Sequence, residues 1–205
     1  MKTRTDILNL LAERYGYQSF LEIGVKSGIN QVKVNVPFRI GVDPDPKTPA
    51  IYHETSDDFF AHNQRFYDLI FVDGNHDGVF AQRDVVNSFE HLHPNGTIVM
   101  HDCNPPDEWS QRPAAEFMGK KGERWNGTAW KAYAYLRMTR PDLSMCVVNL
   151  DEGVGILQRG EQLMAPKRTL NWKFLDDHRQ MLLNLIEPGQ LENWLTQQDQ
   201  LRGVA

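Results

Sequence analysis

The chain has 205 residues, of which 40% are hydrophobic and 24% are charged, with a formal net charge of −5 and a pI near 5.8. This length favours one domain with a substantial core, and the acidic balance argues against nucleic-acid binding, which favours a concentrated basic surface. No segment approaches the ~18 consecutive apolar residues of a membrane span. Residues 1–14 lack a secretory-signal pattern, and the two cysteines lack metal-finger spacing. We therefore expect a cytoplasmic protein with reduced thiols.

The first half of the chain alternates short apolar segments with helical patterns. Strands are predicted at 20–23, 38–43, 51–55, 68–73 and 97–100, and helices at 6–15, 27–34, 57–63 and 78–92. The sequence His93-Pro-Asn-Gly96 is a strong turn signal between the last helix and the last strand. This alternation predicts an α/β fold, a Rossmann-like doubly wound sheet that is mostly parallel and has helices on both faces.

The second half of the chain has a different pattern. Residues 105–125 are too long for an ordinary connection, which is typical of a lid or a substrate-binding loop. A helix is predicted at 127–140, and the segments 143–150 and 154–159 predict an antiparallel hairpin. We divide the chain into a domain at 1–165 and a C-terminal helical extension at 166–205, packed on the same domain. The apolar side chains of its two amphipathic helices, split by Pro188-Gly189, suggest a homodimer surface.

A glycine turn between the first two predicted strands suits an adenosine-bearing cofactor. Gly24 and Gly28 lack a Cβ, so the backbone can turn tightly and a ligand can come close. Asp43 follows at a spacing where a carboxylate can accept hydrogen bonds from ribose hydroxyls. The spacing differs from the G-x-G-x-x-G of nicotinamide sites, and Glu22 lies inside the first strand, where it would disfavour a pyrophosphate.

Four motifs in order resemble class I S-adenosylmethionine-dependent methyltransferases. They are Glu22-Ile-Gly-Val-Lys-Ser-Gly28, Gly41-Val-Asp43, Asp68-Leu-Ile-Phe-Val-Asp-Gly-Asn-His76 and Leu92-His-Pro-Asn-Gly-Thr-Ile-Val-Met-His-Asp102. The bacterial group that includes macrocin O-methyltransferase-like enzymes is the most similar, over about residues 18–160. Lys26 stands where many members carry a glycine. The resemblance implies a terminal antiparallel strand, S-adenosylmethionine as cofactor, and O-methylation of a small-molecule acceptor such as a sugar or natural-product glycan.

The resemblance also assigns the cofactor site. Its residues here are Glu22, Gly24, Lys26, Gly28, Asp43, Ser56, Asp57 and Asp73. The glycine loop would pass under the methionine part, with Glu22 supporting it, and Asp43 would bind the ribose. Ser56 and Asp57 would lie near the adenine, and Asp73 would face the methionine end and the acceptor.

An oxygen acceptor must lose its proton, either to a positioned base or through metal coordination. The catalytic candidates are His76, His101 and Asp102. In macrocin-type relatives the first acid of a D-x-x-H segment helps to hold a divalent metal, a later acid pair completes the site, and the histidine is the proposed base. The matching metal ligands here are Asp73, His101 and Asp102. Because one acid is replaced by histidine, the set suits a transition metal better than Mg²⁺, which prefers oxygen ligands.

Other interpretations stay open at this level. His76, His101 and Asp102 could form the two-histidine, one-carboxylate set of a non-haem oxygenase, and an adenosine site could also serve an NAD-dependent oxidoreductase. The departures at Lys26 and His101 would fit a cofactor-binding module without turnover. A loop histidine that only hydrogen-bonds locally is an equally good interpretation of His76 and of His101. Asn104, Trp109 and Trp125 either line an acceptor pocket or pack the loop.

Overall fold

The computed structural model describes residues 1–117 and 124–203. Its strands are β1 (Ser19–Ile23), β2 (Phe38–Val42), β3 (Tyr67–Val72), β4 (Leu92–Met100), β5 (Leu143–Val148), β6 (Val154–Arg159) and β7 (Leu185–Ile186). Within the described residues they form one seven-stranded sheet in the order β2-β1-β3-β4-β6-β5-β7. The first four strands in that order are parallel, and β6 is antiparallel to both β4 and β5. The predicted fold class is confirmed, but the antiparallel strand that was predicted to be terminal, β6, lies inside the sheet between β4 and β5.

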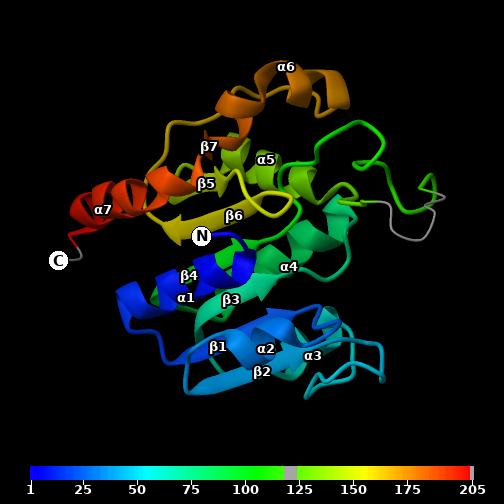
Figure 1. Ribbon diagram of the computed structural model, residues 1–205, viewed down its shortest axis with the longest axis vertical. Helices are drawn as coiled ribbons and strands as arrows, with labels where there is room; N and C mark the ends of the chain where they lie inside the picture. Colours follow the sequence, from blue (N-terminus) through cyan, green and yellow to red (C-terminus); the bar gives the residue numbers. More distant parts are fainter. Residues whose placement is uncertain (118–123, 204–205) are drawn as a thin grey trace.

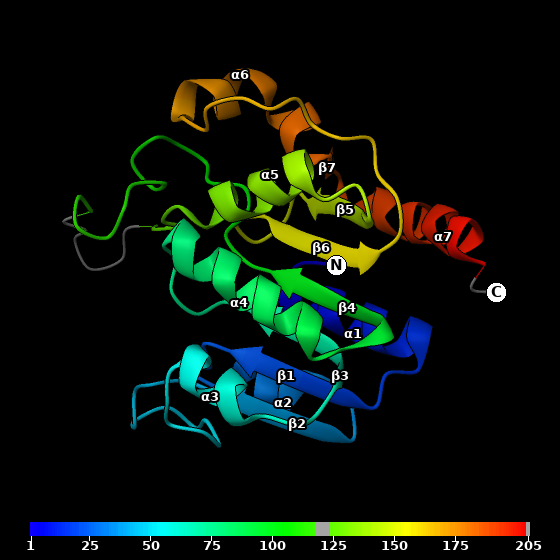
Figure 2. The ribbon, with the colours of Figure 1, turned by 180° about the vertical axis from the view of Figure 1, so that it is seen from behind.

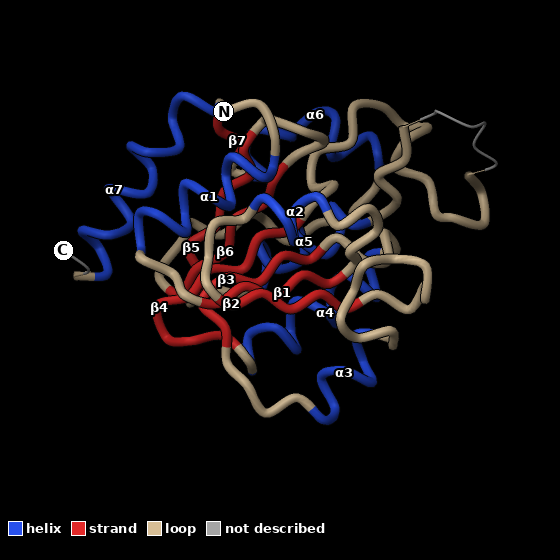
Figure 3. Tube along the Cα trace, turned by 60° about the horizontal axis from the view of Figure 1, so that its bottom comes forward, coloured by secondary structure: helices blue, strands red, loops and turns tan. Residues whose placement is uncertain are grey.

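Helices cover both faces of this sheet. They are α1 (Arg4–Tyr15), α2 (Ile29–Lys33), α3 (Ser56–His62), α4 (Gly78–Glu90), α5 (Ala129–Thr139), α6 (Trp172–Leu183) and α7 (Leu191–Arg202), with a 3₁₀ turn, η1, at Pro188–Gln190. Helices α1, α2 and α7 lie on the face seen in Figure 1. Figure 2 shows α3, α4 and α5 on the opposite face. Figure 3 shows the strands, in red, enclosed between these two layers. None of the described helices has the length and apolar character to cross a membrane.

The two layers build two separate cores because successive side chains of a strand point to opposite faces. In β3, Ile70 and Val72 belong to the core under α3, α4 and α5. Leu69 and Phe71 belong to the core under α1 and α7. A strand buried on both sides must be apolar throughout, which explains why this segment gives the clearest strand signal in the sequence.

Two predicted elements are wrong. Residues 51–55 do not form a strand: only Tyr52 pairs, in an isolated bridge with Val42. Ile51 is 59% exposed, so this segment lacks the buried face that holds a strand in a sheet. The turn predicted at 93–96 lies inside β4, where the register with β3 shifts. The chain there is extended but irregular. Leu92 pairs with Tyr67 and Thr97 pairs with Leu69, so more residues of β4 than of β3 lie between these two pairs.

The other predicted elements are found within a few residues of their predicted bounds. The short strand β7, which pairs with β5, was not predicted. Of the predicted loop at 105–125, residues 118–123 lie outside the described residues, and the remainder forms turns and bends. The last two residues of the predicted extension, 204–205, also lie outside them.

Candidate active site

The candidate site lies at the carboxyl edge of the sheet. The strands β1, β2, β3 and β4 are parallel, and β5 runs in the same direction because both β4 and β5 are antiparallel to β6. The segments that follow these five strands therefore meet at one edge, where ligands bind in such folds. The residues that follow include Gly24, Asp43, Asp73, Asp102 and Asp151.

The glycine loop after β1 is packed directly on the loop after β3. Gly24 has a φ of +87°, and a Cβ there would lie 2.2 Å from the carbonyl oxygen of Asp73. Gly28 has a φ of +73°, and a Cβ there would lie 2.4 Å from the Cγ of Pro49. Between them, Lys26 is exposed and adopts a φ of +50°. The glycines are thus required by the protein's own packing, and their contact with a cofactor stays a prediction.

Asp43 holds this loop in place. One of its carboxylate oxygens accepts hydrogen bonds from the backbone N–H groups of Val25 and Lys26, at 2.9 and 3.0 Å. The other oxygen accepts from the backbone N–H of Asp45 at 2.9 Å. Both carboxylate oxygens of Asp43 thus already have partners in the protein. The contact of Asp43 with ribose hydroxyls stays a prediction.

Glu22 is buried inside β1 and faces α2. Its two oxygens accept hydrogen bonds from the side-chain amides of Asn30 and Gln31, at 2.8 and 2.9 Å. Burial raises the pKa of Glu22 to about 7, although these two hydrogen bonds oppose the shift. Glu22 therefore anchors α2 below the glycine loop.

Ser56 and Asp57, predicted near the adenine, contact α4 instead of the other site residues. Ser56 donates a hydrogen bond to the carboxylate of Asp84 at 2.5 Å, and Asp57 pairs with Arg83 at 2.6 Å. Burial raises the pKa of Asp84 to about 6. These contacts fix the start of α3 against α4, and a role in adenine binding stays a prediction.

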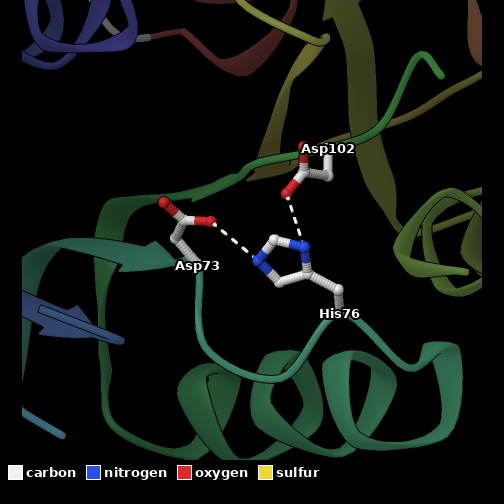
Figure 4. A group of neighbouring side chains, drawn as sticks. All are labelled: Asp73, His76 and Asp102. Carbon is white, nitrogen blue, oxygen red and sulfur yellow. Dashed lines mark ion pairs between the residues drawn. The ribbon is translucent and has the colours of Figure 1, made fainter. Parts of the chain in front are cut away.

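Asp73, His76 and Asp102 converge at the ends of β3 and β4, as Figure 4 shows. The Nδ1 of His76 lies 3.1 Å from an oxygen of Asp102, and its Nε2 lies 3.7 Å from an oxygen of Asp73. The ring of Trp125 stacks on His76 with centroids 4.9 Å apart, and Asn126 donates a hydrogen bond to Asp102 at 2.9 Å. The imidazole is therefore held by the Trp125 ring on one face and by Asp102 at Nδ1, while its Nε2 points toward Asp73.

Asp102 carries backbone strain at this point. Its φ of +59° is in the left-handed region, which non-glycine residues adopt at an energetic cost. The following residue, Cys103, donates its backbone N–H to Gly153 at 3.0 Å, which ties this turn to the hairpin between β5 and β6. The hairpin thereby holds Asp102 in the conformation that turns its carboxylate toward His76.

His101 and Arg4 form a second cluster beside the first. The Nδ1 of His101 lies 3.3 Å from Asp73 and 3.2 Å from Asp102, and its Nε2 lies 3.8 Å from Asp151. Arg4 places Nη1 at 2.9 Å from the Nδ1 of His101 and at 3.4 Å from Asp73. Burial would lower the pKa of His101, but the surrounding carboxylates outweigh it and raise that pKa well above its usual value. Burial would raise the pKa of Asp73, but His101 and Arg4 outweigh it and lower that pKa.

Sequence reasoning did not identify Arg4, Asn126 or Asp151 as site residues. Asp151 offered a usable signal, because a hairpin turn after β5 must lie at the same edge as Asp73 and Asp102. Arg4 and Asn126 offered none, because their places depend on how α1 and the loop before α5 pack. Of the aromatic candidates in that loop, Trp125 is the one that stacks on His76.

The residues do not fit a divalent cation as they are arranged. Among the described residues, Asp73, His76 and Asp102 bring one possible ligand atom each within 4.8 Å of one another. However, each of the four oxygens of the two aspartates already lies 2.9–3.4 Å from a nitrogen of Arg4, His76, His101 or Asn126. The predicted metal set of Asp73, His101 and Asp102 stays a prediction that these contacts do not favour.

Comparison with known proteins agrees with this architecture. A family model for a methyltransferase domain matches residues 44–103, the stretch that ends just after Asp102. No curated protein sequence matches the chain significantly.

Solved structures of methyltransferases share the fold. A methyltransferase from Podospora anserina bound to S-adenosylhomocysteine has a TM-score of 0.55 at 16% identity, covering 78% of this chain and 80% of that one. An O-methyltransferase from Bacillus cereus in complex with S-adenosylhomocysteine has a TM-score of 0.52 at 13% identity, covering 75% and 78%. The O-methyltransferase TomG from Streptomyces achromogenes, in complex with S-adenosylmethionine, has a TM-score of 0.53 at 14% identity, covering 76% and 79%. The chain thus has the fold of class I S-adenosylmethionine-dependent methyltransferases, and its residues 44–103 match a methyltransferase domain.

Proposed function

We propose that the protein transfers a methyl group from S-adenosylmethionine to a hydroxyl oxygen of a small molecule, such as a sugar or a natural-product glycan. The observation that carries this proposal is His76, an imidazole fixed between two carboxylates at the carboxyl edge of the sheet. Similar folds are found in proteins described as O-methyltransferases from Bacillus cereus and Streptomyces achromogenes. A formal net charge of −5 also suits a small acceptor better than a nucleic acid.

His76 is placed to act as the general base. If its Nδ1 carries the hydrogen and donates it to Asp102, the lone pair of Nε2 is free to take a proton. Asn126 fixes Asp102, and Trp125 fixes the plane of the ring. The acceptor O–H gives its proton to Nε2, the oxygen bonds to the methyl carbon, and the bond from that carbon to sulfur breaks. S-Adenosylmethionine supplies the electrophilic methyl group, and the protein supplies orientation and proton removal.

The residues that would hold the cofactor are those around the glycine loop. Gly24 to Gly28, Asp43 and the partly exposed carboxylate of Asp73 border the same edge as His76. A carboxylate suits the cationic methionine end of the cofactor. This favours S-adenosylmethionine over NAD, whose pyrophosphate would be repelled by Asp73.

The test compares binding and turnover in one set of variants. Calorimetry on the intact protein is expected to show binding of S-adenosylmethionine and none of NAD. Transfer of radiolabelled methyl groups to a panel of sugars and glycosides is expected to fall by about 10² to 10⁴-fold in His76→Ala, the usual contribution of a general base. The affinity for S-adenosylhomocysteine is expected to stay within about twofold, since His76 is not assigned to the cofactor. Transfer that persists in His76→Ala would refute the base assignment, and NAD binding in place of S-adenosylmethionine would refute the whole proposal.

A further inference from the structure

We propose that Arg4 and His101 occupy the place of a divalent metal between Asp73, Asp102 and Asp151, so that methyl transfer at this site needs no metal. This inference rests on the proposed function and concerns how the same site balances its charge. It follows from the contacts of two side chains that lie on elements far apart in the sequence.

His101 fills the space between the carboxylates. Its Nδ1 lies 3.3 Å from an oxygen of Asp73 and 3.2 Å from an oxygen of Asp102, so one nitrogen bridges the residues that follow β3 and β4. His101 is only 7% exposed, so its ring is enclosed by the protein. A metal ion bound to Asp73 and Asp102 on the His101 side would have to displace this nitrogen.

Arg4 supplies a charge that does not depend on titration. A guanidinium stays protonated at every pH at which proteins fold. Its Nη1 lies 3.4 Å from Asp73, and its Nε lies 3.7 Å from Asp151. The same Nη1 also lies 2.9 Å from the Nδ1 and 2.5 Å from the Nε2 of His101, so the guanidinium packs against the imidazole as well as against the carboxylates.

The position of Arg4 is built into the fold. Arg4 is the first residue of α1, which begins with a capping box formed by Thr3 and Asp6. Its backbone N–H donates a hydrogen bond to Asp151 at 2.9 Å, which fixes the helix end to the hairpin between β5 and β6. A side chain held at both its backbone and its guanidinium is part of the site, not a passing surface contact.

This arrangement changes what the site can bind. The Arg4 guanidinium offsets part of the negative charge of the three carboxylates, and the imidazole of His101 fills space between Asp73 and Asp102. A metal placed near Asp73 would also lie within a few ångströms of the Arg4 guanidinium, and like charges at that distance repel strongly. The positive field remains available to stabilise the oxygen of the acceptor as it loses its proton. Arg4 acts through Asp73 and His101, so we describe it as a positioning residue.

The first experiment needs no variant. Mn²⁺ is titrated against the full-length wild-type protein by calorimetry and by paramagnetic resonance, and transfer is measured with and without EDTA. We expect no saturable Mn²⁺ binding below 1 mM and no loss of transfer in EDTA. Binding of Mn²⁺ in the micromolar range, or transfer that EDTA abolishes and Mn²⁺ restores, would overturn the inference while leaving the methyltransferase function intact.

The second experiment creates the site that the wild type is inferred to lack. In the double variant Arg4→Gln/His101→Asp, the cation is removed and an acid pair follows β4. We expect at least a tenfold gain in Mn²⁺ affinity and a rise in Tm on adding Mn²⁺. The matched control is Arg14→Gln, which alters another arginine of α1 that pairs with Asp199 away from the site. A double variant that folds, as judged by circular dichroism, yet gains no Mn²⁺ affinity would contradict the inference. Absence of methyl transfer with every acceptor, in a protein that also binds no S-adenosylmethionine, would instead refute the proposed function.

Discussion

At the scale of single residues, burial makes the carboxyl group of Asp84 a weaker acid than an ordinary aspartate. Its carboxylate accepts a hydrogen bond from Ser56 beneath the loop after β3, and burial raises its pKa from 3.8 to about 6. Because the folded state holds the proton more tightly than the unfolded state, the wild type loses stability as the pH rises from 3.8 to 6. Below 3.8 this loss is absent, and above 6 it is complete.

We therefore expect Asp84→Asn to stabilise the protein at pH 8. A shift of two pKa units corresponds to about 3 kcal/mol, and a weaker hydrogen bond from Ser56 reduces the expected gain to about 1–2 kcal/mol. Urea unfolding at several pH values measures it: the difference from wild type should grow between pH 4 and 6 and stay level above 7. Asp57→Asn, which removes an exposed partner of Arg83, is the control and should change stability by less than about 1 kcal/mol. A difference that is independent of pH would show that Asp84 is ionised in the folded protein.

Two glycines separate the effect of a positive φ from that of close packing. Gly16 and Gly24 have φ values of +64° and +87°, but only at Gly24 would a Cβ meet other atoms, at 2.2 Å from the carbonyl oxygen of Asp73. We expect Gly16→Ala to lower the free energy of unfolding by about 1–2 kcal/mol, the cost of left-handed backbone alone. Gly24→Ala must also push the loop after β3 away, so we expect a larger loss and weaker binding of S-adenosylhomocysteine. If urea unfolding gave the same loss of free energy for Gly16→Ala and Gly24→Ala, the loop after β1 could move away from the loop after β3 without cost.

At the scale of elements, the sequence predicts what depends on local pattern. The strands β1 and β3 are short, mainly apolar runs buried on both faces, so their residues alone indicate them. The failures occur where tertiary contacts decide the structure. Residues 51–55 have strand-like composition but no buried face, and β7 is a two-residue strand defined by its pairing with β5.

The same division applies to the site. Asp73, His76 and Asp102 could be predicted to converge, because residues that follow neighbouring parallel strands share one edge. Arg4 could not, because its side chain reaches His101 only through the packing of α1 on the sheet. Ser56 and Asp57 show the opposite case: they follow the right part of the chain, but their side chains face Asp84 and Arg83. The order of the motifs therefore predicts which residues lie at the carboxyl edge of the sheet, but not which way their side chains point.

At the scale of the whole molecule, the C-terminal helices are part of both cores. Leu175, Leu182 and Leu183 of α6 join the core under α5, and Leu191 and Leu195 of α7 join the core with α1. Asp199 of α7 also binds Arg14 and Tyr15 at the end of α1, at 2.6 and 2.9 Å. The apolar tail residues that suggested a dimer surface are thus largely buried within one chain, and the homodimer and the division at residue 165 stay predictions.

This packing leads us to expect that the described chain unfolds as one cooperative unit. Leu195→Ala removes a fully buried side chain of α7 and should lower the free energy of unfolding by about 2–4 kcal/mol. Because α7 and the parallel strands share a core, tryptophan fluorescence and far-ultraviolet circular dichroism should shift to the same lower midpoint. Leu201→Ala is the matched control, the same change on the same helix at a side chain that is 74% exposed, and should alter stability by less than about 0.5 kcal/mol. If Leu195→Ala instead produced two separate transitions, with S-adenosylhomocysteine binding lost only in the second, the tail would be an independent unit resting on a complete methyltransferase domain.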